Sequence, residues 1–584
     1  MQLFLSSINK NYLKYLGGKM KDIISFLLGM GFIFLLGISI SIYEYLKKIK
    51  YLKQNINNSF GKKVDINDIW YKMDSVSNYF ENKEIKNCID DITWNDLNMD
   101  DIYKTINNTQ SSVGRDVLYN ILRNPLHNQE DLIKRDCLID YFTNNEDKRK
   151  EIQFILGKLG ESKDLYPTNC LFINNDNSES KLLKYNILFS ISIISLVLSI
   201  FNSLFFPLFI VSIVINIWTS YRDKKYNYHI DAFTYIISVV NTAVKIRNLN
   251  ITELNNNLND ISINLDSVKH IRNKSLGEGS MMINADLNIF VEYFNKMTLK
   301  ELRNYEKVKN TIISKSKDFQ AIYDYVGCID ALIAVASFRK SLAYYSKPSL
   351  IKSNSKNDNL LEFTDIYHLL INNPVVNSGS FNKSILLTGS NASGKSTFIK
   401  TIAINAILAQ TIYTVCAKDY KSSYFNIYTS MALKDDIFSN ESYYIVEIKS
   451  LKRIIDNSNK DVPCLCFVDE ILRGTNTVER IASSCEVLSH LEKNNTVCFA
   501  ATHDIELTHL LEDKFDNYHF EETITNQDIE FDYKLHKGRA LTRNAIKLLD
   551  FMGYDKDIVD KADNRAKEFL ETGRGVNPST FDTT

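Results

Sequence analysis

One short segment, residues 386–397, restricts the possible folds of this chain more than any other. It reads LLTGSNASGKST, with an apolar run before it and a helix-like run after it. The spacing is that of a G-x4-G-K-S/T loop, in which Gly389 and Gly394 let the backbone wrap closely around phosphate groups. Successive N–H groups and the start of the next helix then face the anion. The segment therefore predicts a phosphate-binding loop between a buried strand and a helix.

Within this loop, the lysine and the residue after it have the most specific expected roles. Lys395 is placed to reach the β- and γ-phosphates of a nucleoside triphosphate, and Ser396 to ligate Mg²⁺ through its hydroxyl. The other loop positions are expected to supply backbone N–H groups or small side chains around the phosphates: Gly389, Ser390, Asn391, Ala392, Ser393, Gly394 and Thr397. Because such a pattern also arises by chance, its meaning depends on two later segments.

Those two segments are strand-like runs that end in polar residues. Residues 464–470 read CLCFVDE, an apolar run of the kind found in buried parallel strands, closed by Asp469 and Glu470. Asp469 is placed to hold the Mg²⁺ shell, and Glu470 to orient or deprotonate the attacking water. Residues 496–503 form a second run, whose terminal His503 is placed to sense the γ-phosphate. Alternatively, the acids only solubilise a strand end and the histidine is an ordinary surface residue. The order of the three segments favours an ATP site.

The arrangement of these motifs resembles the ATPase domain of the MutS family. Its members carry a Thr-Gly-x-Asn phosphate loop, an Asp-Asp…Ser-x-x-x-x-Glu segment, an Asp-Glu…Gly-Thr strand end and a Thr-His switch. The corresponding residues here are 388–391, 435–447, 469–475 and 502–503. A transporter-type ABC ATPase would instead show Leu-Ser-Gly-Gly-Gln before its acidic strand, and this sequence has none.

The resemblance implies roles for further residues. Ser442 falls on the family position that serves the nucleotide of the partner subunit, so it is expected to act in trans within a homodimer. Asn391 and Thr475 also fall on motif positions. The loop departs from the family's usual Gly-Pro-Asn-Met-Gly-Gly-Lys at three small residues, Ser390, Ala392 and Ser393, which are compatible with phosphate binding. The aromatic residue that often stacks on adenine is not found just upstream, where residues 373–377 read NPVVN.

Segments outside the ATPase motifs extend the resemblance to the family's helical core. They are residues 93–103, 108–114 and 122–126, with residues 329–336 resembling the return helix of the core before the ATPase. Residues 533–539 and 545–549 resemble the closing strand and helix of the family. In the family, a Thr-x-x-Gly pattern opens a core helix; here Ser111 takes the place of the threonine, with Gly114 in register. Residues 226–320 read as amphipathic helices, which the family uses as levers. A DNA clamp in that region and a plain solvated helical face remain alternatives, and the composition favours the solvated face.

Charge and cysteine content limit the kinds of partner and the compartment that we expect for this chain. The formal net charge is −1 and the pI about 6.8, so no global basic field indicates nucleic acid. The nine cysteines form no C-x2-C pair, and Cys464 and Cys466 read as core thiols of one strand face, as suits a reducing cytoplasm. With 584 residues, several domains are expected.

Two charge-free segments predict membrane helices. Residues 23–43 carry no charge and have lysines on both sides, which is typical of an uncleaved anchor. Residues 185–220 are also free of charge, with Asn202 near the middle and Pro207 where a second helix would begin. They predict a transmembrane helical hairpin; a pair of buried core helices is the alternative. Basic flanks on both sides favour a cytoplasmic location for both ends.

The sequence thus predicts a multidomain α and α/β protein with a helical MutS-type core and lever domain, a C-terminal P-loop, ABC-like α/β ATPase and transmembrane helices. The expected division is a tail (1–22), a transmembrane helix (23–43), first core part (44–184), hairpin (185–220), second core and lever part (221–345), ATPase domain (346–574) and polar tail (575–584). Only 22 residues precede the first apolar segment, so no mismatch-reading domain with its Phe-x-Glu wedge is expected.

The expected function is that of a membrane-anchored ATPase. It would be a multi-pass protein of the cell (inner) membrane with its ATPase domain in the cytoplasm, using ATP and Mg²⁺ to drive conformational change in a homodimer. Family resemblance implies binding of duplex DNA, including mismatched duplex. The alternative is a nucleotide-controlled membrane scaffold or switch that acts on unknown protein partners. A transporter is disfavoured, because the apolar segments contain few polar groups that could form a substrate path.

Overall fold

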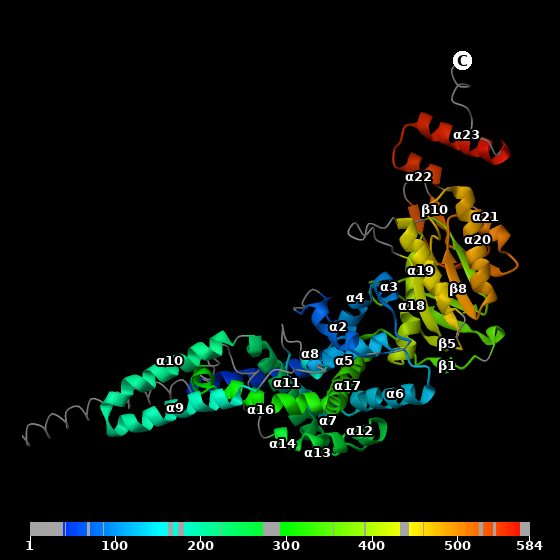
Figure 1. The fold of residues 1–584 in the computed structure, drawn as a ribbon. Helices are drawn as coiled ribbons and strands as arrows, with labels where there is room; N and C mark the ends of the chain where they lie inside the picture. Colours follow the sequence, from blue (N-terminus) through cyan, green and yellow to red (C-terminus); the bar gives the residue numbers. More distant parts are fainter. Residues whose placement is uncertain are drawn as a thin grey trace, which may run out of the picture.

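The computed structural model describes residues 39–40, 42–66, 71–83, 85, 87–161, 168–172, 180–223, 225–272, 293–353, 355–390, 393–431, 443–458, 461–524, 529–540 and 545–572. A helical body and an α/β domain lie side by side, and a long helical hairpin projects from the body (Figure 1). The expected tails, 1–22 and 575–584, and all but a few residues of the expected membrane helix 23–43 lie outside the described residues.

The helical body is built around α17 (Ser316–Ser341), which packs along α5 (Ser112–Arg123). By length and composition α17 could cross a membrane, but 83% of its most apolar window is buried within the protein, so it is a core helix. A helix also covers residues 42–59. The other helices of the body are α2 (Met73–Glu81), α3 (Asp91–Asp96), α4 (Met99–Ile106), α6 (Gln129–Asn144), α7 (Glu146–Leu159), α8 (Thr168–Leu171), α11 (Lys225–Arg247), α12 (Thr252–Asn257), α13 (Ser262–Ser267), α14 (Lys269–Arg272) and α16 (Lys300–Ser314).

The start of α5 explains the Ser-x-x-Gly pattern. Ser111 is the N-cap of α5: its Oγ accepts the N–H of Gly114 at 3.2 Å and donates to Asp330 Oδ2 of α17 at 2.5 Å. A Cβ on Gly114 would lie 2.2 Å from the same carboxylate oxygen, so the two helices can approach this closely only at a glycine. Burial raises the pKa of Asp330 to about 7. The pattern was visible in the sequence, but its buried partner was not.

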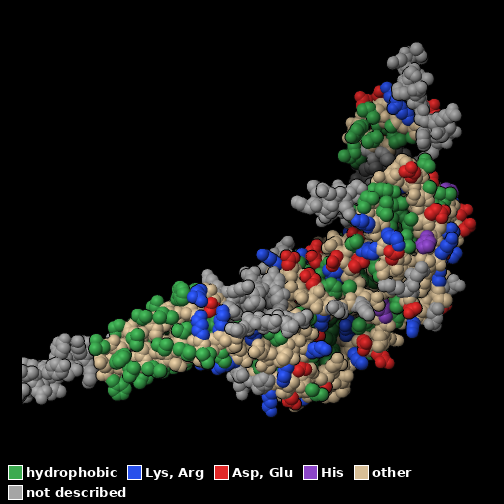
Figure 2. Space-filling model, in the orientation of Figure 1, with side chains coloured by type: hydrophobic (Ala, Val, Ile, Leu, Met, Phe, Trp, Pro, Cys, Tyr) green, Lys and Arg blue, Asp and Glu red, His purple; other side chains and the backbone are tan. Residues whose placement is uncertain are grey.

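The hairpin consists of two antiparallel apolar helices, α9 (Leu182–Phe201) and α10 (Phe206–Arg222), joined by the short 3-10 helix η2 (Ser203–Phe205). Only 17% and 22% of their apolar windows are buried, and apolar side chains cover the exposed surface of the hairpin in Figure 2. The alternative of buried core helices is therefore wrong. Pro207 lies in the first turn of α10, as its fixed φ predicts.

Small polar side chains occupy the interface between the two hairpin helices. Apart from Tyr185, the buried residues of the two helices are small and polar: Ser192, Ser195, Ser212, Asn216, Thr219 and Ser220. Asn216 Nδ2 donates to Ser192 Oγ at 2.9 Å and to the carbonyl oxygen of Met297 at 2.7 Å. In the first turns of α9, Asn186 Oδ1 accepts a hydrogen bond from Arg303 Nε of α16 at 3.0 Å. The base of the hairpin is therefore bonded to the body, while its apolar length extends away from it (Figure 1).

The α/β domain contains a six-stranded sheet, as far as its described residues show, in the order β12-β9-β4-β8-β7-β6. Strands β4 (Ser384–Thr388), β6 (Asn426–Ser430), β7 (Cys464–Asp469), β8 (Thr496–Ala501) and β9 (Phe515–His519) are parallel, and β12 (His536–Lys537) is antiparallel to β9. The helices of the domain are α18 (Lys395–Thr411), α19 (Tyr443–Asn457), α20 (Thr477–Lys493) and α21 (Ile505–Leu510), followed by α22 (Ala545–Phe551) and α23 (Lys556–Thr572).

Shorter strands complete the domain. A second sheet has the order β1-β5-β2-β3, with β1 (Ser349–Ile351), β2 (Leu361–Ile366), β3 (Asn377–Phe381) and β5 (Asp419–Ser423). A separate ribbon pairs β10 (Glu522–Ile524) with β11 (Ile529–Phe531), and a 3-10 helix, η3 (Lys356–Asp358), precedes β2. The expected boundary between helical and α/β parts, at residues 345 and 346, lies between the end of α17 and the start of β1.

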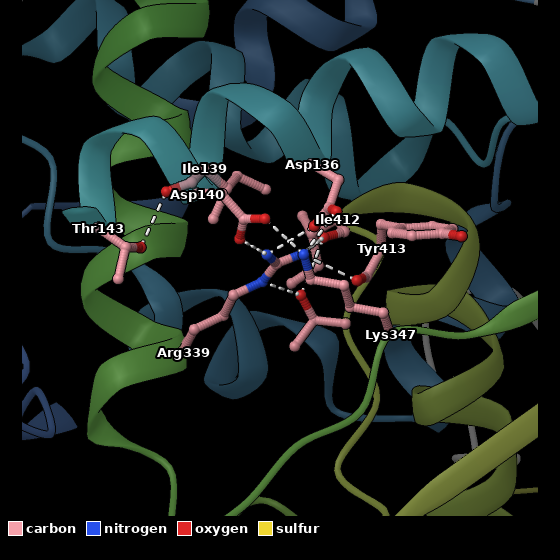
Figure 3. Close-up of polar contacts among 9 residues, drawn as sticks. Asp136, Ile139, Asp140, Thr143, Arg339, Lys347, Ile412 and Tyr413 are labelled. Carbon is pink, nitrogen blue, oxygen red and sulfur yellow. Dashed lines mark hydrogen bonds and ion pairs between the residues drawn. The ribbon is translucent and has the colours of Figure 1, made fainter. Parts of the chain in front are cut away.

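A buried charge cluster joins the helical body to the end of α18 (Figure 3). Arg339, near the end of α17, is only 2% exposed. Its Nη1 donates to Asp136 Oδ1 of α6 at 2.7 Å, and Nη2 donates to the carbonyl oxygen of Tyr413 at 2.9 Å. Its Nε donates to Thr414 Oγ1 at 2.8 Å, and Lys347 Nζ lies 2.7 Å from Asp136 Oδ2. One guanidinium therefore connects α6, α17 and the segment that follows α18.

Candidate functional site

The predicted phosphate loop lies between β4 and α18, at the carboxyl end of the parallel sheet. Gly389 and Gly394 have φ angles of +136° and +98°, which L side chains rarely adopt. A Cβ on Gly389 would also lie 2.8 Å from the carbonyl oxygen of Phe520. Both glycines are thus required by the backbone. Asn391 and Ala392, at the tip of the loop, lie outside the described residues.

Lys395 is the first residue of α18, and its side chain folds back into the loop. The residue is 3% exposed, and its Nζ donates to the carbonyl oxygens of Gly389 at 2.7 Å and Ser390 at 2.6 Å. Burial lowers the pKa of Lys395 to about 8, although the nearby carboxylates of Asp469 and Glu470 raise it in part. The loop therefore encloses an amine whose buried charge would be stabilised by a bound anion.

Ser396 and Asp469 meet where β7 ends beside α18. Ser396 Oγ donates to Asp469 Oδ2 at 2.6 Å. The other carboxylate oxygen, Oδ1, is buried and has no hydrogen-bond partner among the described residues. A hydroxyl and a carboxylate with a free oxygen are hard oxygen ligands of the kind that Mg²⁺ uses together with phosphate oxygens and water. The described residues contain no cluster of three or more His, Cys, Asp or Glu side chains. A Mg²⁺ site with two protein ligands does not need such a cluster, because phosphate oxygens and water supply the other ligands.

Glu470 is held from two sides. Its Oε1 lies 2.8 Å from His503 Nε2, at the end of β8, and its Oε2 forms an ion pair with Arg473 Nε. Burial alone would raise the pKa of Glu470, but the hydrogen bond from His503 and the charge of Arg473 outweigh it and lower the pKa. The carboxylate is therefore ionised at neutral pH. Glu470 also has φ +53°, a strained backbone conformation of the kind that occurs at functional sites.

The structure thus brings together Lys395, Ser396, Asp469, Glu470 and His503, which the sequence placed in three separate segments. Sequence reasoning missed Arg473. Its signal was present, because a cation three residues after Glu470 is close enough to pair with it when the chain turns after β7. Ser393 is buried, and its Oγ donates to the carbonyl oxygen of Ser390 within the loop.

Residues 385–570 match the family model for MutS domain V. The chain is 33% identical over 234 residues to MutS protein homolog 4 of Mus musculus, covering 38% of this chain and 24% of that protein. It is 24% identical over 517 residues to the DNA mismatch repair protein MutS of Fusobacterium nucleatum, covering 81% of this chain and 57% of that protein. Residues 385–570 are thus a MutS domain V.

Coverage differs among these MutS relatives. The DNA mismatch repair protein MSH3 of Debaryomyces hansenii is 26% identical over 305 residues, which covers 48% of this chain and 29% of that protein. The chain therefore spans less than a third of the length of the first relatives that it matches. The matched region includes the loop, the acidic strand end and the Thr-His pair, so the motifs that indicated the MutS family lie within it.

The structure gives less information on the remaining MutS motif positions. Ser442 and the acidic pair before it lie outside the described residues. Thr475 lies in the loop after β7, and its Oγ1 donates to Glu479 Oε2 at 3.0 Å. Thr397 is exposed in the first turn of α18. Ser390, which differs from the usual proline, forms a short hydrogen bond from its Oγ to Glu522 of β10. The nucleotide contacts expected of these residues stay predictions.

Proposed function

We propose that this MutS-like protein is a membrane-anchored ATPase that uses ATP and Mg²⁺ in a homodimer. The observation that carries the proposal is the meeting of a lysine-lined loop with the Ser396–Asp469 pair and the ionised Glu470 at the ends of neighbouring parallel strands. Ligands of α/β proteins bind at this edge of a sheet. The donor set fits a triphosphate with one divalent cation.

The chain's own residues suggest how the site works. Lys395 exchanges its two carbonyl contacts for phosphate oxygens, which relieves the cost of its burial. Ser396 and Asp469 would hold Mg²⁺, which would supply positive charge beside the phosphates. Glu470, kept ionised by Arg473 and His503, orients the attacking water and accepts its proton. His503 lies beside Glu470 and is thus placed to respond to the γ-phosphate. Asn391, Thr475 and, in trans, Ser442 complete the proposed nucleotide contacts.

The membrane anchor rests on the hairpin. Each leg, α9 and the helical segment over 203–222, has 20 residues, and a 20-residue helix is about 30 Å long, the thickness of the bilayer core. Both helices are apolar on their exposed faces and carry cations at the base of the hairpin: Lys181 just before α9, Lys184 in the first turn of α9 and Arg222 at the end of α10. Such a hairpin would place both flanking parts on one side, which we propose is the cytoplasm. Residues 23–43 would add a third span.

Membrane insertion can be tested with Trp218, an exposed residue of α10 whose ring stacks on the guanidinium of Arg222. In the full chain reconstituted into vesicles, we expect lipids brominated in the upper acyl chain to quench part of the tryptophan fluorescence. Trp218→Phe should remove most of that quenching, because the other described tryptophan, Trp94, is buried in the helical body. Trp94→Phe is the control and should leave the quenching intact. Quenching that survives Trp218→Phe would contradict insertion of the hairpin.

Duplex DNA is the proposed effector, because relatives that this chain resembles are called DNA mismatch repair proteins. The test is ATP turnover by the full chain with no DNA, matched duplex, mismatched duplex and single strand, at several salt concentrations. Stimulation by duplex that weakens steeply with salt supports DNA, since phosphate contacts release counterions.

The second candidate is a nucleotide-controlled membrane scaffold or switch acting on a protein complex. The near-neutral charge and the hairpin bonded to the helical body favour it. The rate of ATP turnover would then be unchanged by any of the three nucleic acids but would rise when membrane proteins from the source cells are added to the vesicles. That result would replace the DNA proposal with this one.

A further inference from the structure

A buried glutamate in α19 contacts the loop that carries Glu470. Glu447 is 3% exposed, and its Oε1 accepts a short hydrogen bond from the backbone N–H of Leu472. Its Oε2 is buried without a hydrogen-bond partner among the described residues. Burial raises the pKa of Glu447, although the backbone N–H groups of Leu472 and Arg473 lower it in part. Burying a carboxyl group costs desolvation free energy that an apolar side chain of similar size would not. A position that only filled space would therefore be better occupied by an apolar residue.

The loop it contacts has an unusual backbone. Glu470 and Leu472 have φ angles of +53° and +56°, a region that non-glycine residues rarely adopt. Such conformations persist only where surrounding contacts fix them. The side chains of Ile471 and Leu472 are buried, and the Leu472 N–H is bonded to Glu447. The Glu447 carboxylate is therefore one of the contacts that fix the turn leading out of Glu470.

A second contact joins the same helix to the far end of the loop. A Cβ on Gly474 would lie 2.8 Å from Cβ of Tyr444, one turn before Glu447 in α19. The absence of a side chain at Gly474 therefore lets α19 lie directly against the loop. Between the two contacts lies Arg473, whose guanidinium pairs with the Glu470 carboxylate. Helix α19 thus contacts the loop on both sides of Arg473, the cation that pairs with the Glu470 side chain.

We propose that Glu447 is a positioning residue for ATP hydrolysis: through the Leu472 N–H it holds the loop 470–474 so that Glu470 faces the Ser396–Asp469 pair. This role rests on the proposed ATPase function, with Glu470 as the group that touches the attacking water. Glu447 itself touches neither nucleotide nor water. Its loss should slow the chemical step and leave nucleotide binding intact, because the phosphate loop and the Mg²⁺ ligands are on other elements.

The test compares Glu447→Ala with Glu447→Gln in the full chain in lipid vesicles. Alanine removes the acceptor of the Leu472 N–H, and we expect kcat to fall about 10- to 100-fold with KM for ATP within about twofold, as for misplaced catalytic groups. Glutamine keeps an oxygen at the same place and should restore kcat to within about threefold of wild type. Gly474→Ala, which disturbs the other contact, should resemble Glu447→Ala. Lys452→Ala, on the exposed face of α19, where Lys452 pairs with Asp456, is the matched control and should keep wild-type kcat.

Amide hydrogen exchange provides a readout that does not depend on ATPase activity. The Leu472 N–H should be protected in wild type and in Glu447→Gln, and should exchange faster in Glu447→Ala, while the strand β7 amides stay protected. Unchanged kcat in Glu447→Ala, equal losses of kcat and ATP binding, or failure of glutamine to restore kcat would overturn the proposal. If wild type itself does not hydrolyse ATP, the proposed function falls too; Leu472 exchange would then report separately on the contact.

Discussion

Replacing Glu470 with glutamine should lower ATP turnover by about 100- to 1000-fold, the usual loss when a water-activating group is removed. The carboxylate is ionised because the His503 hydrogen bond and the Arg473 ion pair lower its pKa. Glutamine has nearly the same shape and can still contact His503, but it cannot accept a proton from water. Binding of ATP should remain, because Lys395, Ser396 and Asp469 are unchanged. Steady-state phosphate release and equilibrium ATP binding measure the two effects separately.

The matched control is Glu486→Gln, which makes the same change on the exposed face of α20. It should leave both turnover and binding as in wild type. A Glu470→Gln protein that hydrolyses ATP at the wild-type rate would contradict the role of Glu470. A protein that no longer binds ATP would show instead that Glu470 belongs to the binding site.

Replacing Arg339 with methionine should lower the free energy of unfolding by about 3–5 kcal/mol, as is typical when one partner of a buried ion pair is removed. The guanidinium is nearly inaccessible and satisfies Asp136, Thr414 Oγ1 and the carbonyl oxygen of Tyr413 together (Figure 3). Methionine fills much of the same space but leaves these acceptors without their donor. The remaining cation, Lys347, still pairs with Asp136 and so limits the loss.

Thermal unfolding of the detergent-solubilised chain and hydrogen exchange of residues 411–414 measure this effect. The control is Lys561→Met, which breaks an exposed ion pair with Asp557 in α23 and should change stability by at most about 0.5–1 kcal/mol. We expect the exchange of the segment after α18 to rise in Arg339→Met before the sheet itself opens. Equal stability of the two variants would show that the cluster does not join the helical body to the α/β domain.

Several parts of the fold and site were predictable because they depend on short-range patterns. The loop glycines are dictated by backbone conformation, and an apolar run ending in Asp469 and Glu470 can be read as a buried strand with its polar end at the sheet edge. The hairpin follows from a charge-free segment with a central turn and Pro207. In each case the residues that determine the structure lie within a few positions of one another.

Other parts were not predictable because their partners are remote in sequence. Asp330 meets Ser111 from 219 residues away, and Arg339 meets Asp136 from 203 residues away. Nothing in the neighbourhood of either residue indicates its partner. The second sheet was missed for a different reason: its strands are short and alternate irregularly between buried and exposed positions, as in β2. Tertiary packing, more than local preference, determines such strands.

The central claim is that the loop, the Ser396–Asp469 pair and Glu470 form one site for ATP and Mg²⁺. The most direct measurement is equilibrium binding of ATP to the purified full chain, by titration calorimetry, with Mg²⁺ present and with Mg²⁺ removed by chelation. We expect saturable binding of about one ATP per chain that weakens at least about tenfold without Mg²⁺, since Ser396 and Asp469 would hold the cation and its charge would favour the triphosphate. No saturable binding, or binding of equal strength with and without the cation, would contradict the account.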